Sequence, residues 1–146
     1  MKKEMSFISN LILLAFEITG ITISIIENGG MDISNYINIA NIFMFFSALN
    51  YLASFHYKEK RFKRFVDYIK LTSTTALAFS FLTVVLFMAS ESSLGYLYYL
   101  FHGSYLWIHF LCPGVAIISF IFLEQYEFKY LKGSLIALVF TLIYAV

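Results

Sequence analysis

Long apolar runs separated by short polar stretches make up most of the chain. An α-helix rises 1.5 Å per residue, so about 20 apolar residues cross a hydrocarbon core of about 30 Å. Four runs reach this length, and a fifth is shorter. The runs cover residues 5–26, 33–55, 71–89, 104–123 and 133–146. The pattern predicts an all-α, polytopic helical membrane bundle with four full transmembrane helices plus a short or truncated fifth, in a single domain over 1–146.

The composition excludes a soluble protein of this size. Hydrophobic residues make up 60% of the 146 residues and charged residues only 13%, whereas a soluble domain is roughly half apolar and about a quarter charged. A small domain has too much surface for its volume to hide such an excess. We therefore expect membrane lipids around the chain. Nucleic acid is not an expected partner, because no basic stretch carries the interleaved aromatic residues that such binding needs.

The distribution of charge predicts an orientation. All ten Lys and Arg residues precede the first run, lie within 56–70, or lie between the fourth and fifth runs. The loops on the other side carry only acidic charge: Glu27, Asp32 and Glu91. Because Lys and Arg are retained in the cytoplasm, we expect a multi-pass protein of the cell membrane with a cytoplasmic amino terminus and a cytoplasmic basic loop at 56–70. Such a loop attracts anionic lipid head groups, for about 1 kcal/mol per cation, or docks a partner.

The predicted spans contain polar side chains, which are costly in hydrocarbon and therefore indicate function. Glu17 lies in the first span, Asn38 and Asn41 in the second, Thr83 in the third and His109 in the fourth. Counted from the non-cytoplasmic ends, one polar group in each span lies roughly 8–14 Å deep. The sequence therefore predicts a polar pocket shared by four helices in the outer half of the bundle.

Two of these groups suit acid–base chemistry. A neutral His109 imidazole could take a proton from a hydroxyl or a water molecule while Glu17 orients the ring. Asparagine amides could then donate to a developing oxyanion. The possible nucleophiles are Thr83, Ser80, Cys112 and water, and the sequence does not choose between them. His109 and Glu17 are the candidate catalytic residues, with no cofactor and no metal expected.

The candidate binding residues each have a structural alternative. Asn38 and Asn41 would otherwise hydrogen-bond to neighbouring helices, and Thr83 to a carbonyl of its own helix. His102 would otherwise lie among the tyrosines at the membrane interface. Cys112 is either a thiol that binds a ligand or a metal, or a small packing residue.

Pro113 is expected to kink the fourth helix, because proline cannot donate a backbone hydrogen bond to the carbonyl four residues earlier. The carbonyl at position 109 would be freed, which makes a cavity beside it easier to form. A structural ion pair or hydrogen bond between Glu17 and His109 is the alternative to a shared functional site.

Two segments resemble the androgen-induced membrane hydrolase family and its bacterial multi-pass relatives. The first is YINIANIFMFFSALNYL (Tyr36 to Leu52), with an Asn near the start of a span. The second is LWIHFLCPGVAIISFIFLE (Leu106 to Glu124), in which a His precedes a Pro. The similarity covers most of the chain, and residues 133–146 would match the start of the family's next helix.

This resemblance implies hydrolysis of fatty acid esters of hydroxy fatty acids. By the same resemblance, His109 would be the catalytic histidine and Asn41 the polar residue of helix two near the nucleophile. The family's threonine would fall at Ile37 or Asn38, and neither of these is a nucleophile. The resemblance therefore implies the fold more strongly than the reaction.

Three functional hypotheses follow. The first is a membrane protein that binds a lipid or small molecule in its polar pocket, or acts as a subunit of a membrane complex. Its short fifth segment would then need a partner or a missing remainder of the chain, and the partner would be a membrane subunit or a second copy of the chain. The second hypothesis is a His-dependent intramembrane hydrolase of lipid esters, and the third is a small transporter or pore-forming protein.

Overall fold

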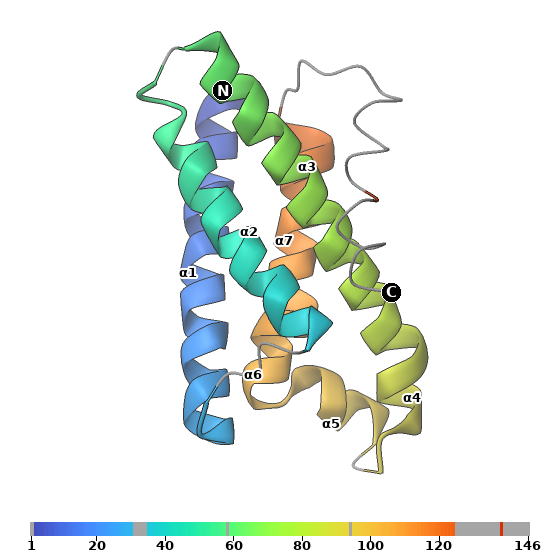
Figure 1. The fold of residues 1–146 in the computed structure, drawn as a ribbon. Helices are drawn as coiled ribbons and strands as arrows, with labels where there is room; N and C mark the ends of the chain where they lie inside the picture. Colours follow the sequence, from blue (N-terminus) through green and yellow to red (C-terminus); the bar gives the residue numbers. More distant parts are fainter. Residues whose placement is uncertain (1, 31–34, 58, 94, 125–137, 139–146) are drawn as a thin grey trace.

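The computed structural model describes residues 2–30, 35–57, 59–93, 95–124 and 138. These residues form an all-α bundle in which four helices are long and apolar enough to span a membrane (Figure 1). The predicted fold class is confirmed, and the chain is a helical membrane protein. The predicted fifth span, 133–146, lies outside the described residues apart from position 138.

The four spans have the following bounds. The first is α1 (Lys2–Asn28), and the second is α2 (Tyr36–Ala53). The third joins α3 (Lys60–Thr83), the π-helical turn η1 (Val84–Met88) and α4 (Ala89–Glu91). A short helix, α5 (Tyr96–Phe101), precedes the fourth span. That span joins α6 (Gly103–Tyr105), the π-helical η2 (Leu106–Leu111), α7 (Cys112–Ile118) and the π-helical η3 (Ser119–Leu123).

The third span begins earlier than predicted. Residues 60–70 are the first turns of α3, so the predicted basic loop at 56–70 is wrong over most of its length. The exposed cations of this stretch are Lys60, Arg61, Lys63 and Arg64, whereas Val66, Asp67 and Lys70 are buried in the interior. Counting charges along the chain missed this helix, because four of residues 60–65 are cations and none of the six is buried, while the buried residues of α3 begin at Val66.

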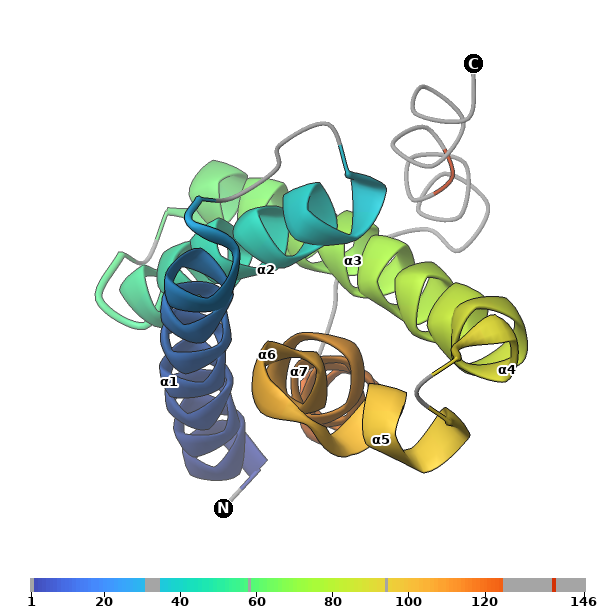
Figure 2. The same cartoon turned by 90° about the horizontal axis from the view of Figure 1, so that it is seen from below.

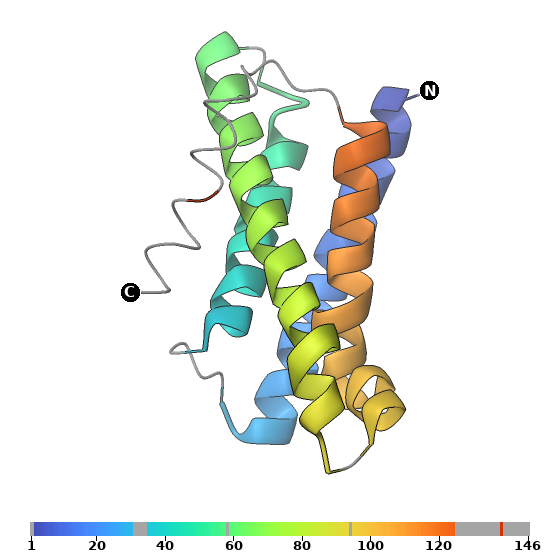
Figure 3. The same cartoon turned by 90° about the vertical axis from the view of Figure 1, so that its right-hand side faces the viewer.

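Each of the first three spans packs against the next, and the fourth closes the bundle. Contacts join α1 with α2 and α2 with α3, and the fourth span packs against both α1 and α3. Viewed along the bundle, α1, α2 and α3 form an arc with α7 on its inner side (Figure 2). Figure 3 shows the spans running alongside one another between two ends. The amino-terminal end carries the starts of α1 and α3, and the opposite end carries the turn between α1 and α2.

Small side chains let the four spans approach closely. Apolar residues of all four spans meet in one buried cluster: Leu13, Ala40, Met44, Ala48, Ala76, Leu77, Cys112 and Ala116. Small residues are typical of helix contacts in membranes, where dispersion contacts replace the hydrophobic effect as the main attraction. At Gly20 of α1, an added Cβ would lie 2.9 Å from both Ile108 Cγ1 and Trp107 Cβ of the fourth span.

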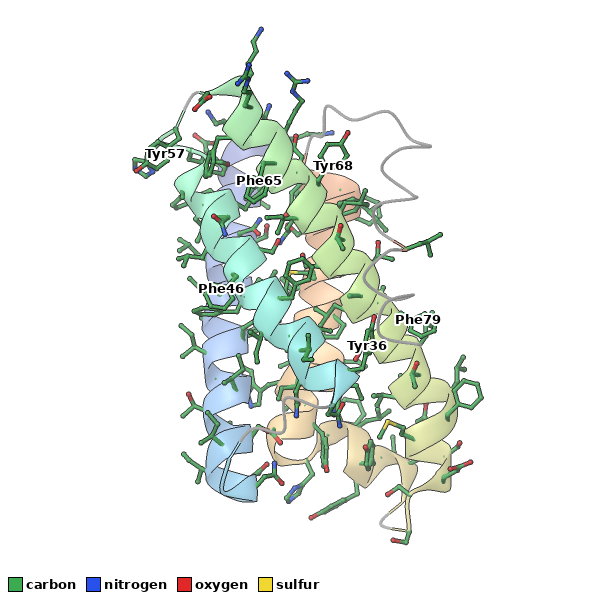
Figure 4. The ribbon with its side chains drawn as sticks, in the orientation of Figure 1. Tyr36, Phe46, Tyr57, Phe65, Tyr68 and Phe79 are labelled. Carbon is green, nitrogen blue, oxygen red and sulfur yellow. The ribbon has the colours of Figure 1, made fainter. Side chains whose placement is uncertain are left out.

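The outer surface of the spans is apolar. Only 33–39% of the residues in the most apolar stretch of each span are buried. Phe46, Phe65 and Phe79, which lie on α2 and α3, are each more than half exposed (Figure 4). A helix that is apolar on its exposed face as well as on its buried face is typical of a protein surrounded by lipid.

At the opposite end, α1 is tied to the start of the fourth span. Glu27 Oε2 accepts hydrogen bonds from the Ser104 backbone N–H (3.1 Å) and the Ser104 hydroxyl (2.7 Å). Gly103 has a φ of +53°, and a Cβ there would overlap the Glu27 carboxylate. Glycine meets both requirements, since it adopts positive φ without strain and leaves room for the carboxylate.

The fourth span is not a regular α-helix in front of Pro113. The turn η2 covers residues 106–111, and the Cys112 N–H donates to the Trp107 carbonyl five residues earlier. Such wide turns are rare and occur frequently at functional sites. His109 lies within this turn.

Candidate functional site

A cavity of about 530 Å³ lies at the opposite end of the bundle. We call it the histidine pocket. Segments of all four spans and α5 line it, because the end of α1, the start of α2 and the start of the fourth span converge there. Its polar lining residues are Ser24, Asn28, Asn35, Asn38, Tyr99, Ser104, Tyr105 and His109. His109 and Asn38, two of the residues selected from the sequence, thus belong to one cavity.

His109 is the most deeply placed titratable group of this pocket, and only 6% of it is exposed. Its ring stacks on Tyr105, with 5.1 Å between the centroids, and lies nearly parallel to Tyr99 at 6.4 Å. Its Nδ1 atom is buried and has no hydrogen-bond partner among the described residues. An imidazole held in this way presents a polar atom that a ligand could satisfy.

The two asparagines differ in their surroundings. Asn38 is partly buried and lines the histidine pocket. Asn41 is fully buried, and its Nδ2 donates to the Ile37 carbonyl at 2.8 Å. Its Oδ1 has no partner among the described residues. Asn41 is not a lining residue of the histidine pocket, so only one of the two predicted asparagines, Asn38, lines this cavity.

Glu17 lies in different surroundings from those predicted. It is fully buried, and neither carboxyl oxygen makes a hydrogen bond of ordinary geometry with the described residues. Its carboxyl group adjoins the Cys112 thiol and interacts with the charge of Lys70. The predicted hydrogen bond or ion pair between Glu17 and His109 is therefore wrong. Stacking on Tyr105, rather than a carboxylate, orients the His109 ring.

The remaining predicted site residues lie outside the histidine pocket. Thr83 donates from its hydroxyl to the Phe79 carbonyl at 3.0 Å, which is the structural alternative proposed for it. His102 is exposed and stacks on Tyr98 with 4.2 Å between the ring centroids. Cys112 is fully buried in the apolar cluster. Among the described residues, no group of three or more His, Cys, Asp and Glu side chains could hold a metal ion.

A second polar centre lies inside the bundle nearer the amino-terminal end. Lys70 is fully buried and donates from Nζ to Asn10 Oδ1 at 2.6 Å. Asn10 Nδ2 in turn donates to Glu124 Oε1 at 2.8 Å, and the Ser119 hydroxyl donates to the same oxygen at 2.6 Å. We call Asn10, Lys70, Ser119 and Glu124 the buried charge cluster. It joins the first, third and fourth spans.

Sequence reasoning missed this cluster, although a signal was present. The charge distribution along the sequence groups Lys70 with the other cations of 56–70, and Glu124 directly follows the apolar run 104–123. The buried residues Val66, Lys70, Ser73, Leu77 and Ser80 recur every three or four positions. That spacing places Lys70 on the interior face of a helix.

Comparisons with known proteins add no relative. No family model, curated protein or solved structure matches the chain. The resemblance to the androgen-induced membrane hydrolase family stays a prediction.

Proposed function

We propose that this membrane protein binds a small amphipathic molecule, with its head group in the histidine pocket. The observation that carries this proposal is the cavity of about 530 Å³ lined by His109, whose buried Nδ1 has no hydrogen-bond partner among the described residues. Ligand pockets commonly have volumes of about 300–1,000 Å³ and combine an apolar wall with a few convergent polar groups. Ile37, Met88 and Ile108 supply the apolar wall here.

The lining chemistry favours an uncharged head group. None of the described lining residues is Asp, Glu, Lys or Arg. Amides, hydroxyls and one imidazole offer both donors and acceptors, which match the hydroxyl and ester oxygens of an acylglycerol. A fully charged head group would find no counter-ion among these residues and would have to give up its hydration.

Binding is better supported than hydrolysis in the same pocket. Within the described part of the chain, no hydroxyl or thiol hydrogen-bonds to the His109 imidazole. Thr83 and Cys112, which were possible nucleophiles, do not line the cavity. A nucleophile activated by histidine needs hydrogen-bond contact with it. Hydrolysis is therefore tested as the alternative outcome of the binding experiment.

The test compares His109→Phe with the wild-type protein in detergent. Phenylalanine keeps a ring for stacking on Tyr105 and removes both nitrogen atoms. We expect monoacylglycerol to raise the Tm of the wild type, and its affinity to fall about tenfold in His109→Phe, the loss that corresponds to one buried hydrogen bond of about 1.4 kcal/mol. His102→Phe is the matched control, because His102 is exposed outside the pocket. Equal affinity in all three proteins would refute the proposal, and release of fatty acid that depends on His109 would favour the hydrolase.

The buried charge cluster favours a second candidate function, the transfer of protons or small cations across the membrane. Lys70, Glu124 and the neighbouring Glu17 are all buried in the spanning region, and ionisable groups inside spans commonly mark ion pathways. Protein in liposomes containing a pH-sensitive dye would then carry a flux that Glu17→Gln abolishes. The matched control is Glu91→Gln, the same change at an exposed position. A wild type without flux would eliminate this candidate.

We further propose that the amino-terminal end faces the cytoplasm of the cell. Lysines and arginines lie in the first turns of α1 and α3, and both helices start at this end of the bundle (Figure 1). Such charge is retained on the cytoplasmic side. A reporter fused before Met1 should be protected from protease added to intact cells. Digestion of that reporter in intact cells would reverse the orientation.

A further inference from the structure

A second cavity, of about 430 Å³, lies at the amino-terminal end. The start of α1, the segment after α2 and the early turns of α3 enclose it. We call it the lysine pocket, because Lys2, Lys3 and Lys63 line it together with Asp67. It is separate from the histidine pocket, and the two have no lining residue in common.

The lysine pocket has an excess of positive charge. Three ammonium groups and one carboxylate line it, which leaves two positive charges in excess. The three lysines come from two different spans, so the fold rather than the sequence brings them together. A single anion in the pocket can contact several of these ammonium groups at once. Phosphate suits such a site because it can accept hydrogen bonds from lysine on several of its oxygens.

Neutral polar groups extend this recognition into the bundle. The hydroxyl oxygens of Ser6 and Tyr51, which both line the cavity, are 2.7 Å apart. Ser54 also lines the cavity and donates to the Tyr51 carbonyl at 2.6 Å. Tyr51 is largely buried, and its ring lies beneath the Lys70 ammonium at 5.8 Å from the ring centroid. The floor of the lysine pocket is thus held in place by the interior of the bundle.

The lining of the cavity also includes apolar side chains. Phe55, Tyr57 and Leu123 line it. The Lys3 Nζ atom lies 5.5 Å from the centroid of the Phe55 ring, so one of the lysines is placed over an aromatic surface. A free phosphate ion has no apolar group to pack against these side chains, whereas the glycerol and first acyl carbons of a phospholipid would pack against them.

We propose that the lysine pocket binds a phosphate group carried by an anionic phospholipid of the surrounding leaflet. The cations hold the phosphate, the hydroxyls of Ser6 and Tyr51 are close enough to share it, and the apolar side chains receive the glycerol backbone. This is a defined site, in contrast to the general attraction of basic residues to a membrane surface. It is independent of the function proposed for the histidine pocket.

Two triple variants test this site against general attraction. The pocket variant is Lys2→Gln, Lys3→Gln and Lys63→Gln. The control variant is Lys60→Gln, Arg61→Gln and Arg64→Gln, which removes the same charge from exposed cations of α3 that do not line the pocket. Because all six side chains are exposed, both variants should fold, and circular dichroism checks that they do.

Lipid binding is measured by native mass spectrometry of the detergent-solubilised full chain. The probes are phosphatidylglycerol, phosphatidylcholine of the same acyl chains, and inorganic phosphate. We expect the wild type to prefer phosphatidylglycerol over both other probes. The pocket variant should bind it at least about tenfold more weakly, since each cation near anionic lipid contributes severalfold in affinity, and the control variant should change less than about threefold.

Three results would overturn the proposal. Equal weakening in the two triple variants would mean general attraction without a site. Phosphatidylcholine binding as tightly as phosphatidylglycerol would mean that the charge of the phosphate is not recognised. Inorganic phosphate that displaces phosphatidylglycerol at an equal concentration would assign the pocket to the free ion instead of a lipid.

Discussion

Lys70 and Glu124 meet inside the bundle, with 3.8 Å between Nζ and Oε1 and no exposure of either side chain. The contact links α3 to the end of η3, and Asn10 of α1 bridges the two through one hydrogen bond to each. An ion pair in such surroundings is stable only when its remaining donors and acceptors are also satisfied. Asn10 and Ser119 satisfy part of this requirement.

Removing one charge of the pair should destabilise the protein strongly. Lys70→Met leaves the Glu124 carboxylate buried without its cation, and the expected loss is about 3–5 kcal/mol of unfolding free energy. Lys70→Met combined with Glu124→Gln should recover a large part of that loss, because the double variant removes both charges of the pair. Thermal unfolding in detergent measures both variants, and Lys60→Met at an exposed position is the control. Additive losses in the double variant would show that the pair is not coupled.

Gly20 should not tolerate a larger side chain. The Cβ of Gly20→Ala would lie 2.9 Å from atoms of Trp107 and Ile108, so α1 would be pushed away from the fourth span. Overpacking of this kind lowers stability by about 1–3 kcal/mol. Gly114→Ala is the matched control, because nothing lies within 4 Å of its added Cβ. There the helix preference for alanine should leave stability unchanged or raise it by about 0.5–1 kcal/mol. A Tm for Gly20→Ala at or above that of Gly114→Ala would contradict the packing described.

Tyr99 should make the protein less stable at alkaline pH. Burial, and to a smaller extent the neighbouring Tyr105, raise the pKa of the Tyr99 phenol above its ordinary value of 10.0. The folded state therefore holds this proton more tightly than the unfolded state, so the contribution is complete below about pH 10 and is lost as the pH rises further. The Tm of Tyr99→Phe should decline less than that of the wild type between about pH 9 and 11. Parallel curves would mean that the folded state does not shift this pKa.

Cys112 should resist thiol reagents in the folded protein. Its side chain is fully buried between the spans, so a maleimide must wait for the bundle to open. We expect slow labelling in mild detergent and rapid labelling after denaturation, followed by intact mass. Cys112→Ser with Ser90→Cys supplies an exposed thiol for comparison. If both proteins are labelled at the same rate, then Cys112 does not lie in a closed core.

Hydropathy was sufficient to predict the bounds of three of the four spans, because apolar length is the main requirement that a bilayer imposes on a helix. The runs 5–26, 33–55 and 104–123 correspond to α1, α2 and the fourth span within a few residues. The run 71–89 marked only the later part of the third span. There the criterion failed for a physical reason: four of residues 60–65 of α3 are cations and none of the six is buried, so the apolar run begins only after the helix has started.

The candidate site was predicted only in part, because the depth of a residue along a helix does not determine the direction in which its side chain points around the helix axis. His109 and Asn38 have both the depth and the direction to reach one pocket. Glu17 was predicted at a similar depth to His109 but points towards Cys112 and Lys70 instead. The polar side chains that residue counts place at one depth therefore belong to two separate sites, the histidine pocket and the surroundings of Glu17. Only the helix packing distinguishes them.

The wide turn η2 also determines which residues of the fourth span face the interior. Successive residues of an α-helix are rotated by about 100°, so one surplus residue in a π-helical turn offsets all later positions by that angle. Deleting a single residue between His109 and Cys112 would therefore leave the sequence of α7 intact while rotating it relative to His109. Cys112 would then leave its place beside Glu17, and another residue of α7 would face that carboxyl group. The number of residues between His109 and Cys112 therefore sets the rotation of α7 about its axis, and inserting or deleting one residue there would change which side chains of α7 face the interior.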